Sequence, residues 1–87
     1  MRKLSAPEVI LEVLLAGAIS EDQARHYLAN YRYYERQRSD LERNHAGRWA
    51  ASLNEEIYLA DSLIQVQQEI ERLPHTKTAY IEQVKAP

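Results

Sequence analysis

The fold is decided by the stretch Trp49-Ala50-Ala51-Ser52-Leu53-Asn54-Glu55-Glu56-Ile57-Tyr58-Leu59-Ala60, at residues 49–60. Its first five side chains alternate, so that the side chains of Trp49, Ala51 and Leu53 share one face and those of Ala50 and Ser52 the other, which predicts a strand. Asn54-Glu55 is typical of a tight turn, and the strand formers Ile57 and Tyr58 follow it. The stretch therefore predicts a β-hairpin, with Trp49, the only tryptophan, anchoring the core between the hairpin and the helices.

A helix and a closing strand are expected after the hairpin. Ser62 and Gln65 have the spacing of a helix cap, and the helix ends before Pro74. Its single apolar stripe consists of Leu63, Val66, Ile70 and Leu73. Residues 78–84 then predict a strand. A right-handed crossover places this last strand beside the first strand of the hairpin and antiparallel to it, so the sheet order is 2-1-3.

Two helices are expected before the hairpin. The first spans about residues 6–16, where apolar side chains cover most of the circumference, so it either fills the core or serves as a dimerisation or partner-docking helix. The second begins at the capping box of Ser20 with Gln23 and runs to about Asn44. Because Asn30 could cap a separate helix, this segment is either one long helix or two with a break near residues 29–31. The predicted class is α+β, with N-terminal helices and a β-β-α-β unit.

The 87 residues are 45% hydrophobic and 28% charged, which fits one domain over residues 1–87, helical to residue 46. Without cysteine no disulfide can form, and no apolar run is long enough to span a membrane, so we expect a cytoplasmic protein. The net charge of -2 gives no general attraction to nucleic acid. His26, His45 and His75 are isolated, so their spacing is not that of a metal site. Both glycines end helices, so there is no glycine-rich loop that could bind a phosphate. We therefore expect no metal, no cofactor and no catalysis.

One part of the sequence resembles a known family. Tyr33-Tyr34-Glu35, the segment His45-Ala46-Gly47-Arg48-Trp49-Ala50-Ala51, the hairpin and Asp61-Ser62-Leu63 are similar to the small prokaryotic domain-of-unknown-function family 5678. The resemblance covers residues 31–84. It implies an aromatic-bearing helix, a hairpin, a capped helix and a final strand, and it implies no activity. Asn54-Glu55 stands where the family usually has a turn containing glycine, and Ala50 where it has valine.

A basic ridge is expected along the second helix. Arg25, Arg32, Arg36 and Arg43 fall near one line of a continuous helix, away from the stripe of tyrosine and leucine. This ridge is either a solvated face, with Arg36 paired to Asp40, or a binding surface for a protein or for nucleic acid. The candidate partner-binding residues are Arg25, Arg32, Arg36, Arg43, Tyr33, Leu11, Leu14 and Leu15.

The sequence favours a small protein–protein interaction module or regulatory partner subunit that self-associates and has no catalytic activity. The alternative is a small nucleic-acid-binding regulator that uses the helix rich in arginine and tyrosine. Self-association is expected because the first helix is too apolar to be covered by one three-stranded sheet, and because the sheet leaves edges unpaired.

Overall fold

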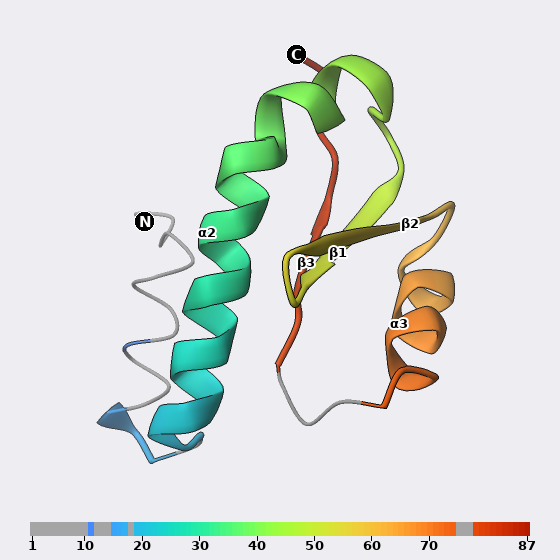
Figure 1. Cartoon of the computed structure of the whole chain (residues 1–87). Coiled ribbons are helices and arrows are strands. Elements are labelled where there is room, and N and C mark those ends of the chain that lie inside the picture. The colour runs from blue at the N-terminus through green and yellow to red at the C-terminus, as the bar shows by residue number, and fades with distance from the viewer. Residues whose placement is uncertain (1–10, 12–14, 18, 75–77) are drawn as a thin grey trace.

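The computed structural model describes residues 11, 15–17, 19–74 and 78–87. Along the chain lie α2 (Glu21–Asn44), β1 (Trp49–Leu53), β2 (Glu56–Ala60), α3 (Leu63–Glu71) and β3 (Tyr80–Gln83). The sheet has the order β2-β1-β3, and α2 and α3 lie on opposite sides of it (Figure 1). The predicted α+β class and strand order are thus confirmed. Most of the helix expected over residues 6–16 lies outside the described residues.

Both strand pairings are antiparallel. Ser52 lies opposite Ile57 of β2 and opposite Tyr80 of β3. The turn between β1 and β2 has positive φ at both central residues, 52° at Asn54 and 59° at Glu55, as a type I′ turn requires. The expected hairpin is therefore present, although neither turn residue is a glycine.

β3 begins two residues later than predicted. The carbonyl of Thr78 accepts a hydrogen bond of 2.7 Å from the Asn30 side chain. At the other end, Val84 exchanges backbone hydrogen bonds of 2.8 Å with Gly47 and Arg48 beyond the last residue of β3. The segment just before the strand is thus bound by a side chain from α2, which no local pattern could indicate.

α2 is one continuous helix, so the alternative of a break near residues 29–31 is wrong. It begins at the predicted capping box, in which Ser20 and Gln23 bond each other's backbone. It ends at Asn44, and Gly47 then turns the chain with a φ of 88°. Asn30 does not cap a helix, because its side chain bonds to other parts of the fold.

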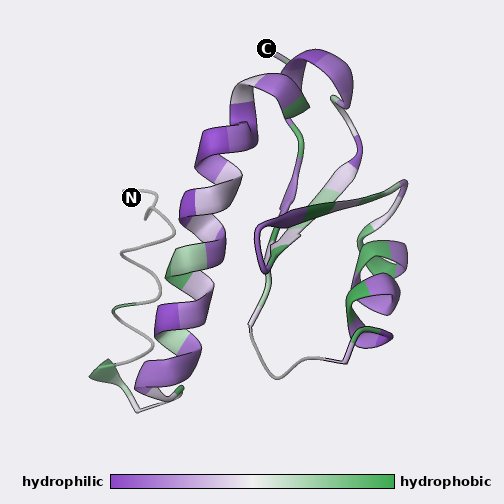
Figure 2. Cartoon of the chain, in the orientation of Figure 1, coloured by the Kyte–Doolittle hydropathy of each residue, from purple (hydrophilic) through white to green (hydrophobic). Residues whose placement is uncertain are grey.

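The alternating side chains of β1 enter two separate clusters. On one face Ala50 packs with Tyr34, Leu41, Tyr80 and Val84. On the other face Ala51 and Leu53 pack with Ala60 and with the α3 residues Val66 and Ile70. α2 packs over β1 and β3, whereas α3 packs over β2 and β1. Figure 2 agrees, since α3 carries its hydrophobic residues toward the sheet, while much of α2 is hydrophilic.

The expectation that Trp49 anchors the core is wrong. Trp49 is only partly buried, and it packs against the buried cluster that includes Val66 and Ile70 of α3. It is the first residue of β1, opposite Ala60 and Gln83, the last residues of their strands, so it lies at one end of the sheet. Among the residues that the structure describes, the largest apolar side chains that are fully buried are those of Tyr34, Leu53 and Val66. Among the described residues, no helix is long and apolar enough to cross a membrane.

Candidate interaction surface on α2 and the hairpin

The predicted ridge of four arginines is divided by ion pairs. Arg25 lies 3.4 Å from Asp22, and Arg43 pairs with Asp40, each three residues earlier on α2. The expected pair of Arg36 with Asp40 is therefore wrong, because Arg43 takes that carboxylate. Arg32 and Arg36 have no acidic partner among the described residues, so the ridge provides two unpaired guanidinium groups at its centre.

Tyr33 and Arg36 form a stacked pair. The guanidinium carbon of Arg36 lies 5.3 Å from the centre of the Tyr33 ring. The ring holds the cation without neutralising it, in contrast to the carboxylates beside Arg25 and Arg43. The structure thus brings together three of the predicted partner-binding residues, namely Arg32, Tyr33 and Arg36.

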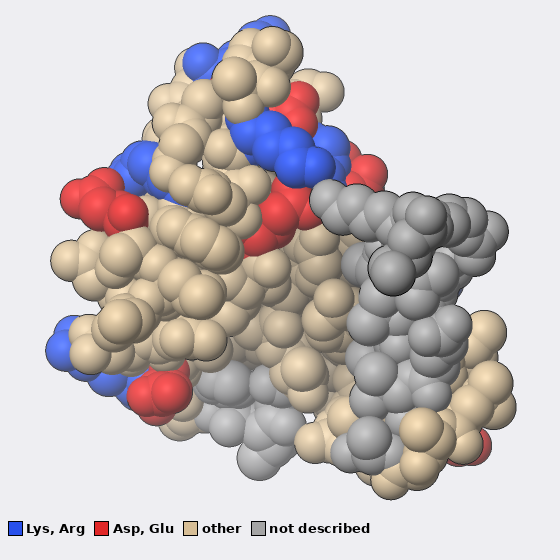
Figure 3. All heavy atoms as spheres, turned by 180° about the vertical axis from the view of Figure 1, so that it is seen from behind, with Lys and Arg blue, Asp and Glu red and all other residues tan. Residues whose placement is uncertain are grey.

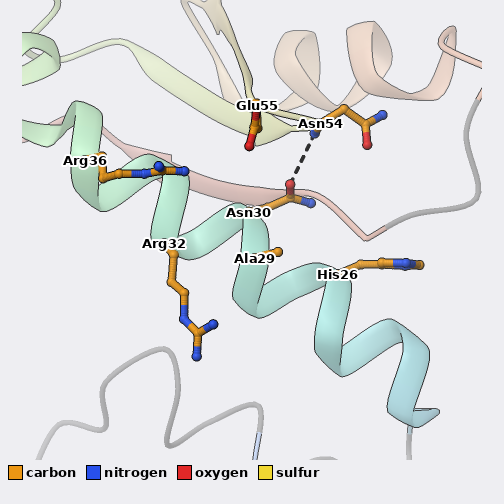
Figure 4. A pocket seen from close by; sticks show the side chains of 7 residues that line it. All are labelled: His26, Ala29, Asn30, Arg32, Arg36, Asn54 and Glu55. Atoms are coloured by element: carbon orange, nitrogen blue, oxygen red, sulfur yellow. Dashed lines mark hydrogen bonds between the residues drawn. The ribbon is translucent and has the colours of Figure 1, made fainter.

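An open hollow of about 490 Å³ lies between the first half of α2 and the hairpin turn. It is lined by His26, Ala29, Asn30, Arg32, Arg36, Asn54 and Glu55. Figure 4 shows Arg36 extending along the side of α2 that faces the hairpin, whereas Arg32 leaves the helix on the side away from it. Arg36 and the hairpin residue Glu55 therefore bring opposite charges to the hollow, whereas Arg32 lines it with its guanidinium directed away from the hairpin.

Asn30 fixes the hairpin against α2. Its side-chain carbonyl accepts a hydrogen bond of 3.2 Å from the backbone N–H of Asn54, and its amide donates to Thr78. Only 5% of Asn30 is exposed, so these bonds satisfy a buried polar group. Both partners are distant in sequence, so helical spacing gives no sign of this role.

A second hollow, of about 220 Å³, lies along the second half of α2. It is lined by Gln37, Asp40, Leu41, Asn44, His45, Ile57 and Leu59. Ile57 and Leu59 are on the face of β2 that points toward α2, and both are only partly buried. Because α2 covers β1 and β3, the aliphatic side chains of β2 remain accessible on this face.

Sequence reasoning missed the ion-pair network of Arg38. Its guanidinium binds both carboxylate oxygens of Glu82, at 2.5 and 3.1 Å, and its Nε donates to Glu35 at 2.7 Å. Arg38 also lies over the Tyr34 ring, 4.9 Å from its centre. These contacts join α2 to β3. The spacing of Arg38 from Glu35 is visible in the sequence, but Glu82 is too distant to be assigned from a pattern.

Tyr80 is the centre of an aromatic cluster beside this network. Tyr27, Tyr31 and Tyr34 meet its ring edge to face, with centres 5.1 to 5.5 Å away. The Tyr80 hydroxyl donates to Glu82 at 2.6 Å. Burial, and next this bond to Glu82, raise the pKa of Tyr80, and burial with the charge of Glu82 raises that of Tyr34. Burial alone would raise the pKa of Glu82, but the bonds from Arg38 and Tyr80 outweigh it and lower that pKa.

The remaining predicted partner-binding residues precede α2. Leu11 is 54% exposed and Leu15 is 78% exposed, whereas Leu14 lies outside the described residues. Leu63 and Ile64 at the start of α3 are the other large hydrophobic residues that the described chain exposes. Arg32, Arg36 and Tyr33 are thus one candidate surface, and Leu11 with Leu15 is another.

One face of the molecule carries mixed charge. On the face opposite the view of Figure 1, acidic and basic side chains lie next to one another (Figure 3). Within the described residues no group of three or more histidine, aspartate or glutamate side chains could hold a metal ion. Arg32 and Arg36, which have no acidic partner among the described residues, differ from Arg25, Arg43 and Arg48, each of which pairs with an aspartate.

Comparison with known proteins found no matching family, no matching curated protein and no matching solved structure. The resemblance of residues 31–84 to family 5678 accordingly stays a prediction.

Proposed function

We propose that this chain is a protein-interaction module or regulatory partner subunit that self-associates in the cytoplasm and acts by binding, without catalysis. The observation that supports self-association most strongly is the exposure of Leu11 and Leu15. These residues are four positions apart and both helical, so they lie on one side of the helix. Burying an aliphatic side chain stabilises an interface by about 1.5–3 kcal/mol, and a symmetric dimer would bury each residue twice.

The arrangement of the charged groups supports a binding role. Arg38 forms an ion pair with Glu35 within α2 and another with Glu82 of β3. These groups stabilise the fold. Arg32 and Arg36 are exposed and have no acidic partner among the described residues, and together with the exposed leucines they are suited to recognising a surface.

Sedimentation equilibrium of matched variants tests self-association. Leu15→Gln should weaken the dimer at least about tenfold, because each copy loses a buried aliphatic group. Ile64→Gln is the control, since Ile64 is also a large aliphatic residue, 67% exposed, on another part of the chain. It should leave the dimer unchanged. A wild-type monomer at micromolar concentration, or equal weakening by both variants, contradicts the proposal.

A second candidate function is nucleic-acid binding. It is supported by the stacking of Arg36 on Tyr33, because such pairs also stack on bases, and by the unpaired Arg32 nearby. The pairing of Arg25 and Arg43 with aspartates favours the protein partner, since it removes half of the charge expected along the ridge.

A further inference from the structure

We infer that the two hollows form one groove, which binds an extended segment of another protein that carries carboxylates at one end and aliphatic side chains at the other. We call it the α2–β2 groove and define its cationic end by Arg32 and Arg36 and its aliphatic end by Leu41, Ile57 and Leu59. This inference rests on the proposed function, because it names the partner of a binding module.

The hollows follow one another along the same two elements. Arg36 lines the first and its neighbour Gln37 lines the second. On the opposite wall, Asn54 and Glu55 line the first hollow, and Ile57 and Leu59 of the same hairpin line the second. From Asn30, which lines the first hollow, to Leu41, which lines the second, α2 rises about 17 Å, which matches five or six residues of an extended peptide.

Charge complementarity indicates the acidic end of the partner. The guanidinium group of Arg36 lies on the side of α2 that faces the first hollow, and Arg32 lines the same hollow from the helix (Figure 4). Neither arginine has an acidic partner in the described chain, and the hairpin wall contributes the single carboxylate of Glu55. Carboxylates are natural partners of arginine because its planar donors bind both oxygens. Arg36 is held by its stacking on Tyr33, so a ligand would meet a cation whose position is already restricted.

The second hollow indicates the aliphatic end. Leu41 is buried, and Ile57 and Leu59 are partly buried on the one strand that α2 does not cover. An aliphatic side chain placed there would bury its own surface and complete the packing of these three residues. A nucleic-acid backbone would instead need phosphate contacts along the whole groove, and its aliphatic end provides none.

The wall of the groove is fixed before any ligand binds. The hydrogen bonds of Asn30 to Asn54 and Thr78 hold the hairpin turn and the start of β3 against α2. A segment that enters the groove therefore meets a formed site, which lowers the entropic cost of binding.

The test is a titration, followed by NMR of the full chain, with a synthetic hexapeptide of sequence Glu-Asp-Glu-Leu-Val-Leu. We expect shifts of Arg32, Arg36, Ile57 and Leu59 signals. The variant Arg32→Gln/Arg36→Gln should bind at least about tenfold more weakly, and Ile57→Thr should also bind more weakly. The matched control Arg25→Gln/Arg72→Gln removes the same charge at two exposed arginines that line neither hollow, and it should bind as the wild type does.

Several results would overturn the inference. These are no binding at millimolar peptide, equal weakening by the two double variants, or tighter binding of a single-stranded oligonucleotide than of the peptide. Melting curves confirm that each variant is folded. The proposed self-association is tested separately. A dimer that does not bind the peptide would refute only the groove. A monomer that binds the peptide would refute only self-association.

Discussion

Two polar residues of α2, Asn30 and Arg38, determine how the helix lies on the sheet. Asn30 binds the hairpin turn and the start of β3, and Arg38 binds Glu82 of β3. Neither role could be predicted from sequence, because the partners are 24 to 48 positions away. Local spacing gave only one suggestion for Asn30, a helix cap, and the continuous helix rules that out.

The variant Asn30→Ala should lower the free energy of unfolding by about 2–3 kcal/mol, because it leaves the Asn54 N–H and the Thr78 carbonyl without their partner. Urea denaturation measures this loss. Ser39→Ala, at an exposed position of the same helix, is the control and should change little. An effect of Asn30→Ala no larger than that of the control would show that the hydrogen bonds of Asn30 to Asn54 and Thr78 are not formed.

Because of Glu82, we predict that the free energy of unfolding decreases at acidic pH. Burial opposes its charge, but bonds from Arg38 and Tyr80 lower its pKa in the folded state below the ordinary 4.5. The unfolded chain therefore takes up a proton first as the pH falls. The stabilisation is complete above about pH 4.5 and is lost as the pH falls through the lowered pKa.

Urea denaturation at a series of pH values tests this linkage. Glu82→Gln should flatten the slope below pH 4.5 and also lower the free energy of unfolding at neutral pH, since it removes the partner of Arg38. Glu71→Gln, an exposed carboxylate at the end of α3, should keep the wild-type slope. Equal slopes in the wild type and Glu82→Gln would contradict the pKa assigned to Glu82.

At the scale of the elements, local signals predicted most of the structure. Capping pairs at Ser20 and Ser62 mark the starts of α2 and α3, and alternation at 49–53 marks β1. The partial burial of Trp49 could not be predicted. The alternation of side chains shows on which face of a strand a residue lies, but it does not show which end of the sheet a helix covers. The pairing of Arg25 and Arg43 was within reach, since Asp22 and Asp40 precede them by three positions.

The hairpin turn carries backbone strain that a glycine would relieve. Asn54 and Glu55 both have positive φ, which asparagine tolerates better than glutamate does. Glu55→Gly should therefore raise the free energy of unfolding by about 1 kcal/mol, whereas Asn54→Gly should change it by less. Thermal denaturation of the two variants provides the measurement. A destabilised Glu55→Gly would mean that the turn is not of type I′.

At the scale of the molecule, the sheet is covered unequally by its two helices. Each helix spans only two of the three strands, so β2 is left accessible on the face toward α2. The sequence predicted exposed apolar surface and an arginine-rich helix, but it could not show that Arg32 and Arg36 line a hollow beside the hairpin. That placement depends on the packing of α2 against β1 and β3.

Native mass spectrometry of the protein purified from the cells that produce it tests the binding role most directly. Each chain has a mass of 10.1 kDa. We predict an assembly of at least two copies, alone or with a bound protein, that survives nuclease treatment. A single 10.1 kDa chain at micromolar concentration, or an assembly that nuclease reduces to single chains, would contradict it.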